Sequence, residues 1–171
     1  GIATMQGLAM ATARPLVAVS ALEALSHVAV ERAGTGVTRV LAWSDARRGE
    51  VFAQVFALHE GARPEALGAA QVGPPAELAL AFGPDLLDHS VVVVGDAAAG
   101  TDALWSAAGA TCVVTCPAAP LAGVMARIGA RRAASGDTGH PHAVRPLYVR
   151  RPDAEVARAR AARSEDRRAP R

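Results

Sequence analysis

The sequence predicts an α/β fold in which a mixed sheet is flanked by helices. Residues 91–135 read as strand, helix, strand, helix, an order typical of parallel strands with helical crossovers. Two apolar runs on either side of residues 45–50 predict an antiparallel hairpin with a four- to five-residue loop. Both faces of these runs are largely apolar, which is typical of strands in the middle of a sheet with a layer on each side.

Composition narrows the class of protein. The chain has 171 residues, of which 51% are apolar, enough for one domain with a core. All 18 basic residues are arginine, and eight of them lie with four acids in 150–171, so the remainder carries a net charge of about −2. That balance argues against a basic nucleic-acid surface on the folded part. No apolar run approaches the ~18 residues of a membrane span and no signal peptide is evident, so we expect no membrane association and a cytoplasmic protein.

The first segment predicts a helix over 1–13, which Pro15 ends. Ala3, Gly7, Met10 and Ala11 recur at three- and four-residue spacing on it. A glycine inside a helix costs about 1 kcal/mol relative to alanine. Close approach of another helix along the small-residue stripe formed by Ala3, Gly7 and Ala11 would offset that cost. The alternative is ordinary packing against the body of the same domain.

The remaining elements follow from periodicity and capping residues. Ser20 begins a helix that runs to about Arg32, and Glu23 would complete its capping box. In chain order we further expect strands at 16–19 and 69–72, a helix over 76–82, a loop at 85–90, a strand at 91–94, a helix from Asp96 as N-cap to about 108, a strand at 111–115, a helix over 120–135 and an extended piece at 145–153. From residue 154 onward apolar periodicity is absent, which predicts a frayed helix or disorder.

Two stretches are candidates for chemistry. The strand-to-helix turn at Gly95 and Asp96 could present backbone N–H groups to an anion, but no Lys-Ser/Thr pair follows Gly100, so we favour a structural turn. Asp45 and Glu50 could form a carboxylate pair. The loop also contains Arg47, Arg48 and Gly49, and this pattern favours a set of salt bridges over acid–base chemistry.

Metal and cofactor sites are not predicted. Structural zinc sites use four ligands in two close pairs. Cys112 and Cys116 are four residues apart at one probable strand, and His140 and His142 lie in a remote loop. We therefore expect no metal, no cofactor and no catalytic residue.

Five sequence blocks, at 1–9, 20–25, 45–52, 94–96 and 146–155, occur in the order found in one family. The chain resembles the TsaB (YeaZ) family, the bacterial non-catalytic partner subunits of the machinery that makes threonylcarbamoyladenosine in tRNA. The blocks Asp-Ala-Arg-Arg-Gly-Glu and Arg-Arg-Pro-Asp-Ala-Glu are the most specific.

The resemblance implies an actin-like (ASKHA, Hsp70-like) fold of two lobes. Residues 1–150 would be a partial domain, mainly the C-terminal lobe, in which 1–14 is a helix of the N-terminal lobe, followed by an arginine-rich tail at 151–171. Family members carry an Asp-Thr-Ser turn and a Gly-Pro-Gly-Ser-Phe-Thr-Gly-Leu-Arg segment ahead of this helix, and neither is present. The resemblance therefore implies that most of the N-terminal lobe is missing.

The implied function is assembly rather than catalysis. In the family this subunit pairs with the transferase TsaD, or with a second copy of itself, and the ATPase TsaE joins the complex. TsaD transfers the threonylcarbamoyl group to N6 of adenosine 37 in tRNAs reading ANN codons, so tRNA is met indirectly. We favour a solvated tail over one that touches tRNA. There are two alternatives. One is a stand-alone nucleotide hydrolase or peptidase-like enzyme, supported by the Gly95–Asp96 turn. The other is a poorly soluble product of a pseudogene or of a mis-called gene start.

Overall fold

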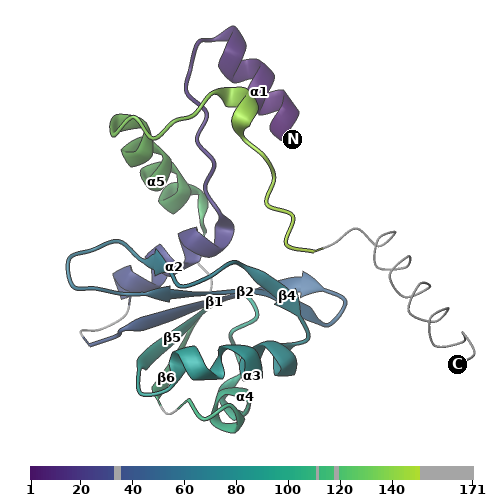
Figure 1. The fold of residues 1–171 in the computed structure, drawn as a ribbon, viewed down its shortest axis with the longest axis vertical. Helices are drawn as coiled ribbons and strands as arrows, with labels where there is room; N and C mark the ends of the chain where they lie inside the picture. The colour runs from purple at the N-terminus through teal and green to yellow at the C-terminus, as the bar shows by residue number, and fades with distance from the viewer. Residues whose placement is uncertain (33–35, 111, 118–119, 151–171) are drawn as a thin grey trace, which may run out of the picture.

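The computed structural model of the protein describes residues 1–32, 36–110, 112–117 and 120–150 (Figure 1). In chain order the elements are α1 (Ile2–Ala11), α2 (Ala21–Arg32), β1 (Arg39–Arg47), β2 (Glu50–Ala57), β3 (Glu65–Ala66), β4 (Gln71–Gly73), α3 (Pro75–Leu86), β5 (Ser90–Gly95), α4 (Asp102–Ala107), β6 (Cys112–Pro117), α5 (Ala122–Ala134) and the 3₁₀ helix η1 (Pro141–Ala143). The disorder predicted for 151–171 lies outside the described residues.

The strands form a mixed sheet with the order β3-β2-β1-β5-β6, and β4 also pairs with β2. β1 and β2 are the antiparallel hairpin, whereas β1, β5 and β6 run parallel to one another. Helices α2 and α5 contribute to the apolar core on one face of the sheet, and α3 and α4 to the core on the other (Figure 1). The predicted mixed sheet with flanking helices is confirmed.

The hairpin strands are buried on both faces because their side chains alternate between two cores. Leu41 and Trp43 point to the α3/α4 side, and Val40 and Ala42 point to the α2/α5 side; each is at most 1% exposed. The Trp43 ring meets Trp105 of α4 edge to face, with 5.0 Å between ring centroids. In a chain with few aromatics, this pair anchors α4 to the sheet.

The hairpin turn is shorter than predicted. β1 extends to Arg47 and β2 starts at Glu50, so Arg48 and Gly49 alone form the loop. Both have positive φ, 60° and 75°, as a two-residue turn of the mirror-image type requires. A bulge after Asp45 gives Arg47 a positive φ of 64° as well. Arginine is not a residue that signals such a turn, so the prediction of a four- to five-residue loop was wrong.

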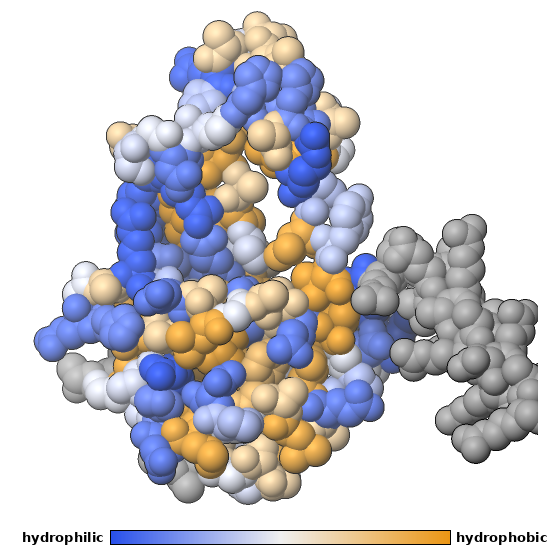
Figure 2. All heavy atoms as spheres, in the orientation of Figure 1, coloured by the Kyte–Doolittle hydropathy of each residue, from blue (hydrophilic) through white to orange (hydrophobic). Residues whose placement is uncertain are grey.

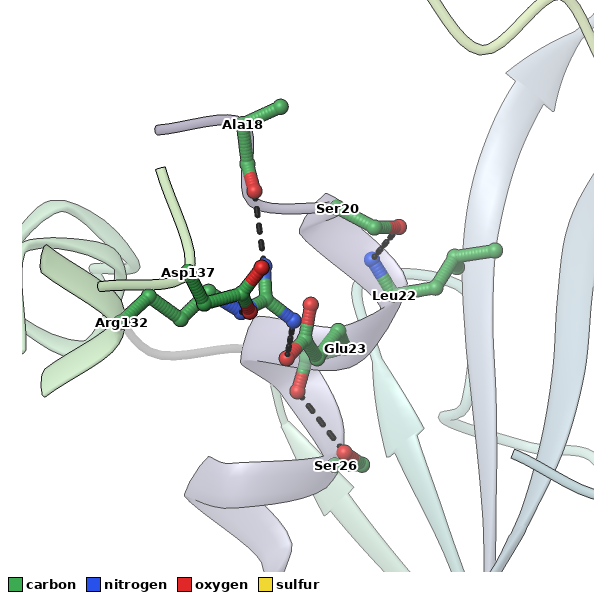
Figure 3. Close-up of polar contacts among 7 residues, drawn as sticks. All are labelled: Ala18, Ser20, Leu22, Glu23, Ser26, Arg132 and Asp137. Atoms are coloured by element: carbon green, nitrogen blue, oxygen red, sulfur yellow. Dashed lines mark hydrogen bonds and ion pairs between the residues drawn. The ribbon is translucent and has the colours of Figure 1, made fainter. Parts of the chain in front are cut away.

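Residues 16–19, predicted as a strand, do not pair with the sheet. The segment runs extended and half-buried, and its carbonyl at Ala18 accepts a hydrogen bond from Arg132 of α5 at 2.7 Å. Ser20 caps α2 as predicted, because its Oγ accepts from Leu22 N at 3.2 Å. The expected second half of the capping box is wrong: the Glu23 carboxylate binds Arg132 at 2.6 Å instead (Figure 3).

Helix α3 is longer than the predicted 76–82 and continues through Pro84 to Leu86. An internal proline costs about 3 kcal/mol of helix stability. The extension places the fully buried Leu86 in the core beside Phe82, and Leu87 N closes the last turn on Gly83 O at 3.1 Å. Burial of a large side chain offsets the cost of the proline, which the sequence pattern does not reveal.

β5 ends at a close backbone crossing with β1. A Cβ atom added to Gly95 would lie 1.9 Å from the carbonyl oxygen of Trp43, and the φ of Gly95 is +148°. Only a residue without a side chain fits between the two strands at this point.

We therefore expect Gly95→Ala to destabilise the fold by about 3–5 kcal/mol, because the clash is with backbone and cannot relax cheaply. Urea unfolding measures the loss. Gly100→Ala is the matched control: Gly100 has φ +75° but open space around it, so it should cost only about 1–2 kcal/mol of left-handed strain. Equal losses in the two variants would contradict the clash.

Arg132 ties α5 to α2 and to the segment before it (Figure 3). Besides Ala18 O and Glu23, its Nε lies 3.8 Å from Asp137. The Arg132 and Glu23 side chains are 27% and 21% exposed, whereas the nearby pair of Arg127 and Glu31 is 57% exposed at both ends.

Arg132→Met should lower the free energy of unfolding by about 1–3 kcal/mol, since it removes charge-assisted hydrogen bonds from a sheltered position. A double-mutant cycle that combines Arg132→Met with Glu23→Gln should give a favourable coupling free energy between the two side chains. Arg127→Gln, the exposed control, should cost below about 1 kcal/mol. A cycle with no coupling between Arg132 and Glu23 would rule out the stabilising pair.

His27 of α2 makes stability depend on pH. Burial and, secondarily, the charge of Arg131 lower the pKa of its imidazole below 6.5. The folded chain then holds this proton more weakly than the unfolded chain, so the free energy of unfolding should fall as pH drops below about 6.5. Unfolding in urea at pH 7.5 and 5.5 should show a smaller pH effect in His27→Gln than in wild type, with His142→Gln as control. An unchanged slope in His27→Gln would contradict this assignment.

Candidate functional site

α1 lies away from the sheet and meets the rest of the described chain on one side (Figure 1). Ala9 is buried there, and the Gln6 amide donates to Pro141 O at 3.0 Å and Val144 O at 3.1 Å. The helix carries no charged residue: its sequence is IATMQGLAMA. A helix that is apolar all round normally has its other sides covered as well.

The predicted small-residue stripe lies on the opposite, open face of α1. Ala3, Gly7, Met10 and Ala11 are all exposed, and a Cβ added to Gly7 would meet nothing within 4 Å. Larger apolar side chains of α1 are also open: Leu8 is 56% and Met10 49% exposed, and Met5, which lies on the groove side of the helix, is 50% exposed. The described part of the chain thus leaves an uncharged helix face with a central notch free for contact.

A groove of about 460 Å³ runs beside this helix. Its walls are Ile2 and Met5 of α1, the extended segment 16–20, Met125 of α5 and the returning segment 144–147. Figure 2 shows apolar side chains around the hollow between α1 and the body of the molecule. The apolar surface of α1 therefore continues into the groove.

The turn at Gly95 and Asp96 contacts β1 of the hairpin. Asp96 was predicted to be an N-cap, and that is wrong: α4 begins six residues later, at Asp102, with Thr101 as its N-cap. The Asp96 carboxylate instead accepts a hydrogen bond from Asp45 N at 2.9 Å, across from the hairpin. Gly95 is required by its contact with Trp43, and the turn does not lead directly into a helix N-terminus, the feature on which the expected anion site depended.

The loop Asp45–Glu50 is a set of paired charges, as the sequence favoured. Asp45 Oδ1 accepts from Arg47 N at 2.7 Å, and its other oxygen lies 3.2 Å from the Arg47 guanidinium. Glu50 forms an ion pair with Arg150 from the far end of the described chain. Both carboxylates are occupied by different cations, so they do not form an acid–base pair with each other.

Sequence reasoning missed two residues that organise this region, Arg132 and Arg150. Arg132 lies near the end of α5, whose apolar pattern predicts the helix but not this contact, and Arg150 lies outside the helices and strands. For Arg150 a signal was present: the two most specific family blocks, at 45–50 and 150–155, carry the two ends of the Glu50–Arg150 contact.

The described residues hold no group of three or more His, Cys, Asp or Glu side chains placed to bind a metal ion. His140 and His142 stack on each other with 5.2 Å between ring centroids, and His140 Nδ1 accepts from His142 N at 3.3 Å. These contacts stabilise η1. Within the described parts of the chain, none of the helices has the length and apolar character that crossing a bilayer demands.

Two solved structures from Pseudomonas aeruginosa share this fold. One, described as an uncharacterized protein with similarity to peptidase YeaZ, aligns with a TM-score of 0.65 and 26% identity, over 87% of this chain and 65% of its own. The other, YeaZ, aligns with a TM-score of 0.63 and 26% identity, over 86% and 65%. This chain therefore spans slightly less than two thirds of the length of either.

Comparison with protein-family models and with curated proteins finds no match. The solved structures nevertheless confirm the resemblance that the sequence blocks predict: in fold and in sequence, this chain is similar to YeaZ (TsaB).

Proposed function

We propose that this chain is a non-catalytic partner subunit that binds and supports a TsaD-type transferase, which modifies N6 of adenosine 37 in tRNAs reading ANN codons. The observation that carries the proposal is the open, uncharged face of α1 around Gly7. The proposal also takes the fold to be of the actin-like (ASKHA) class and the protein to act in the cytoplasm.

The α1 face has the properties of a helix-pairing surface. Small residues at Ala3, Gly7 and Ala11 let a second helix approach closely, which increases van der Waals contact along the whole pair. Leu8 and Met10 lie closer to the notch and would bury apolar surface at about 25 cal/mol per Å². Methionine side chains adapt to an irregular partner surface. No charge has to be desolvated on this side.

The candidate polar residues support an assembly role. Asp96 accepts from the hairpin backbone, Asp45 binds Arg47, and Glu50 binds Arg150. Each carboxylate is used to hold one segment of chain against another. The peptidase name attached to one solved neighbour belongs to that protein. The alternative, a hydrolase or peptidase-like enzyme, rested on the Gly95–Asp96 turn, whose geometry is explained by packing.

TsaD is the direct partner in this proposal. TsaE joins the complex of the two proteins, and tRNA is bound through that complex. A homodimer through the same face would be a competing assembly. Co-purification with TsaD of the same organism tests the proposal directly. No complex, together with unchanged tRNA modification after loss of the gene, would refute it.

Gly7→Leu should leave the fold intact, since its Cβ meets open space, and should raise helix propensity by close to 1 kcal/mol. The added side chain fills the notch, so affinity for TsaD should fall at least about ten-fold, or ~1.4 kcal/mol. Titration calorimetry with purified TsaD measures this. Ala76→Leu, a small-to-large change at an exposed position of α3, is the control and should bind as wild type. Unchanged affinity of Gly7→Leu would exclude this face.

A further inference from the structure

The described chain ends in a segment that returns from η1 to the hairpin tip and is fixed there by Arg150. The Arg150 guanidinium pairs with the Glu50 carboxylate, lies 3.5 Å from Arg47 O, and sits over the Phe52 ring with 5.9 Å to its centroid. Three different groups of the hairpin thus hold one side chain.

These contacts are more sheltered than an ordinary surface ion pair. The Arg150 and Glu50 side chains are 29% and 36% exposed. Phe52 is half-buried against the α2/α5 core, so the aromatic contact is with a fixed ring. Partial burial and cation–π contact both strengthen a charge pair relative to a solvated one.

The other end of the returning segment is attached to α1. Gln6 donates to Pro141 O and Val144 O, and Pro146 and Leu147 then line the groove opposite Ile2 and Met5. Residues 144–150 therefore connect the α1 region to the hairpin tip, parallel to the extended link at 12–20 (Figure 1).

We propose that Arg150, Glu50 and Phe52 form a clasp that holds residues 144–150 against the hairpin and so sets the position of α1 relative to the sheet. Arg150 is a positioning residue in this device. The clasp gives the Glu50 carboxylate a partner, while the Asp45 carboxylate pairs with Arg47. The link from clasp to partner affinity rests on the proposed function, whereas the clasp itself does not.

Limited proteolysis of the whole chain tests the clasp. Chymotrypsin can cut after Leu147 and Tyr148, which are 68% and 81% exposed in the clasped segment. Glu50→Gln and Arg150→Met should each raise the cleavage rate at these sites about ten-fold, because the segment would detach more often. Mass spectrometry identifies the cuts. Glu77→Gln, the same charge loss at an exposed position of α3, should leave the rate unchanged.

A charge swap separates the clasp from a mere packing role. Glu50→Arg combined with Arg150→Glu should restore much of the protection that either single change removes. Thermal melts show whether the sheet stays folded in each variant. If Glu50→Gln weakens the hairpin itself, the cleavage rate of Arg150→Met is still compared with that of wild type. Wild-type cleavage rates in both single variants, or no rescue by the swap, would overturn the clasp.

Affinity for TsaD tests the link to α1. Glu50→Gln should weaken binding although it lies far from Gly7. Faster cleavage with unchanged affinity would overturn the positioning of α1 and keep the clasp. If wild-type protein binds no TsaD, the proposed function fails while the proteolysis result still decides the clasp.

Discussion

The structure depends on β1 being buried on both faces while it is paired on both edges. β1 binds β2 in antiparallel and β5 in parallel register, and its side chains supply both cores. At Trp43 three constraints meet: the ring contacts Trp105, the carbonyl leaves room only for Gly95, and the next residues open the bulge before the turn. Because β1 cannot shift without exposing one core, the hairpin tip beyond it is held in a fixed place.

Because the hairpin tip is fixed, the carboxylates of Asp96 and Glu50 can hold other segments of the chain against it. Asp96 follows β5 beside the hairpin and accepts a hydrogen bond from the backbone N–H of Asp45, which lies beyond the last β1–β5 pair, Ala42 and Val94. Glu50 then faces outward toward the returning chain and receives Arg150. Acids at the end of a central strand often indicate a catalytic site. Here each carboxylate binds a backbone group or an arginine and so holds two segments of the chain together.

Local sequence patterns correctly predicted the elements that are determined by interactions between residues close in the sequence. The Val91–Val94 run, the apolar hairpin strands and the Ser20 cap were all read correctly, because burial, pairing and capping act within a few residues. The spacing of Ala3, Gly7 and Ala11 indicated a small-residue stripe on α1 but left open whether the body of the same domain covers it. Three errors arose where contacts distant in the sequence determine the local structure. Glu23 pairs with Arg132 and not with the start of its own helix, and Asp96 accepts a hydrogen bond from the hairpin. Burial of Leu86 stabilises the continuation of α3 beyond Pro84. Arg150 and Glu50 are 100 residues apart, so no local pattern joins them.

The attachment of α1 differs in kind from the rest of the fold. The sheet and its helices are held by two apolar cores, whereas the α1 region is held largely by side-chain contacts from Gln6, Arg132 and Arg150. Each of these is worth on the order of 1–3 kcal/mol and fixes direction more than it buries surface. Meanwhile Leu8 and Met10 of α1 are 56% and 49% exposed, so the free energy of covering them is still available for association. A helix positioned by polar contacts and apolar toward solvent is suited to binding a partner.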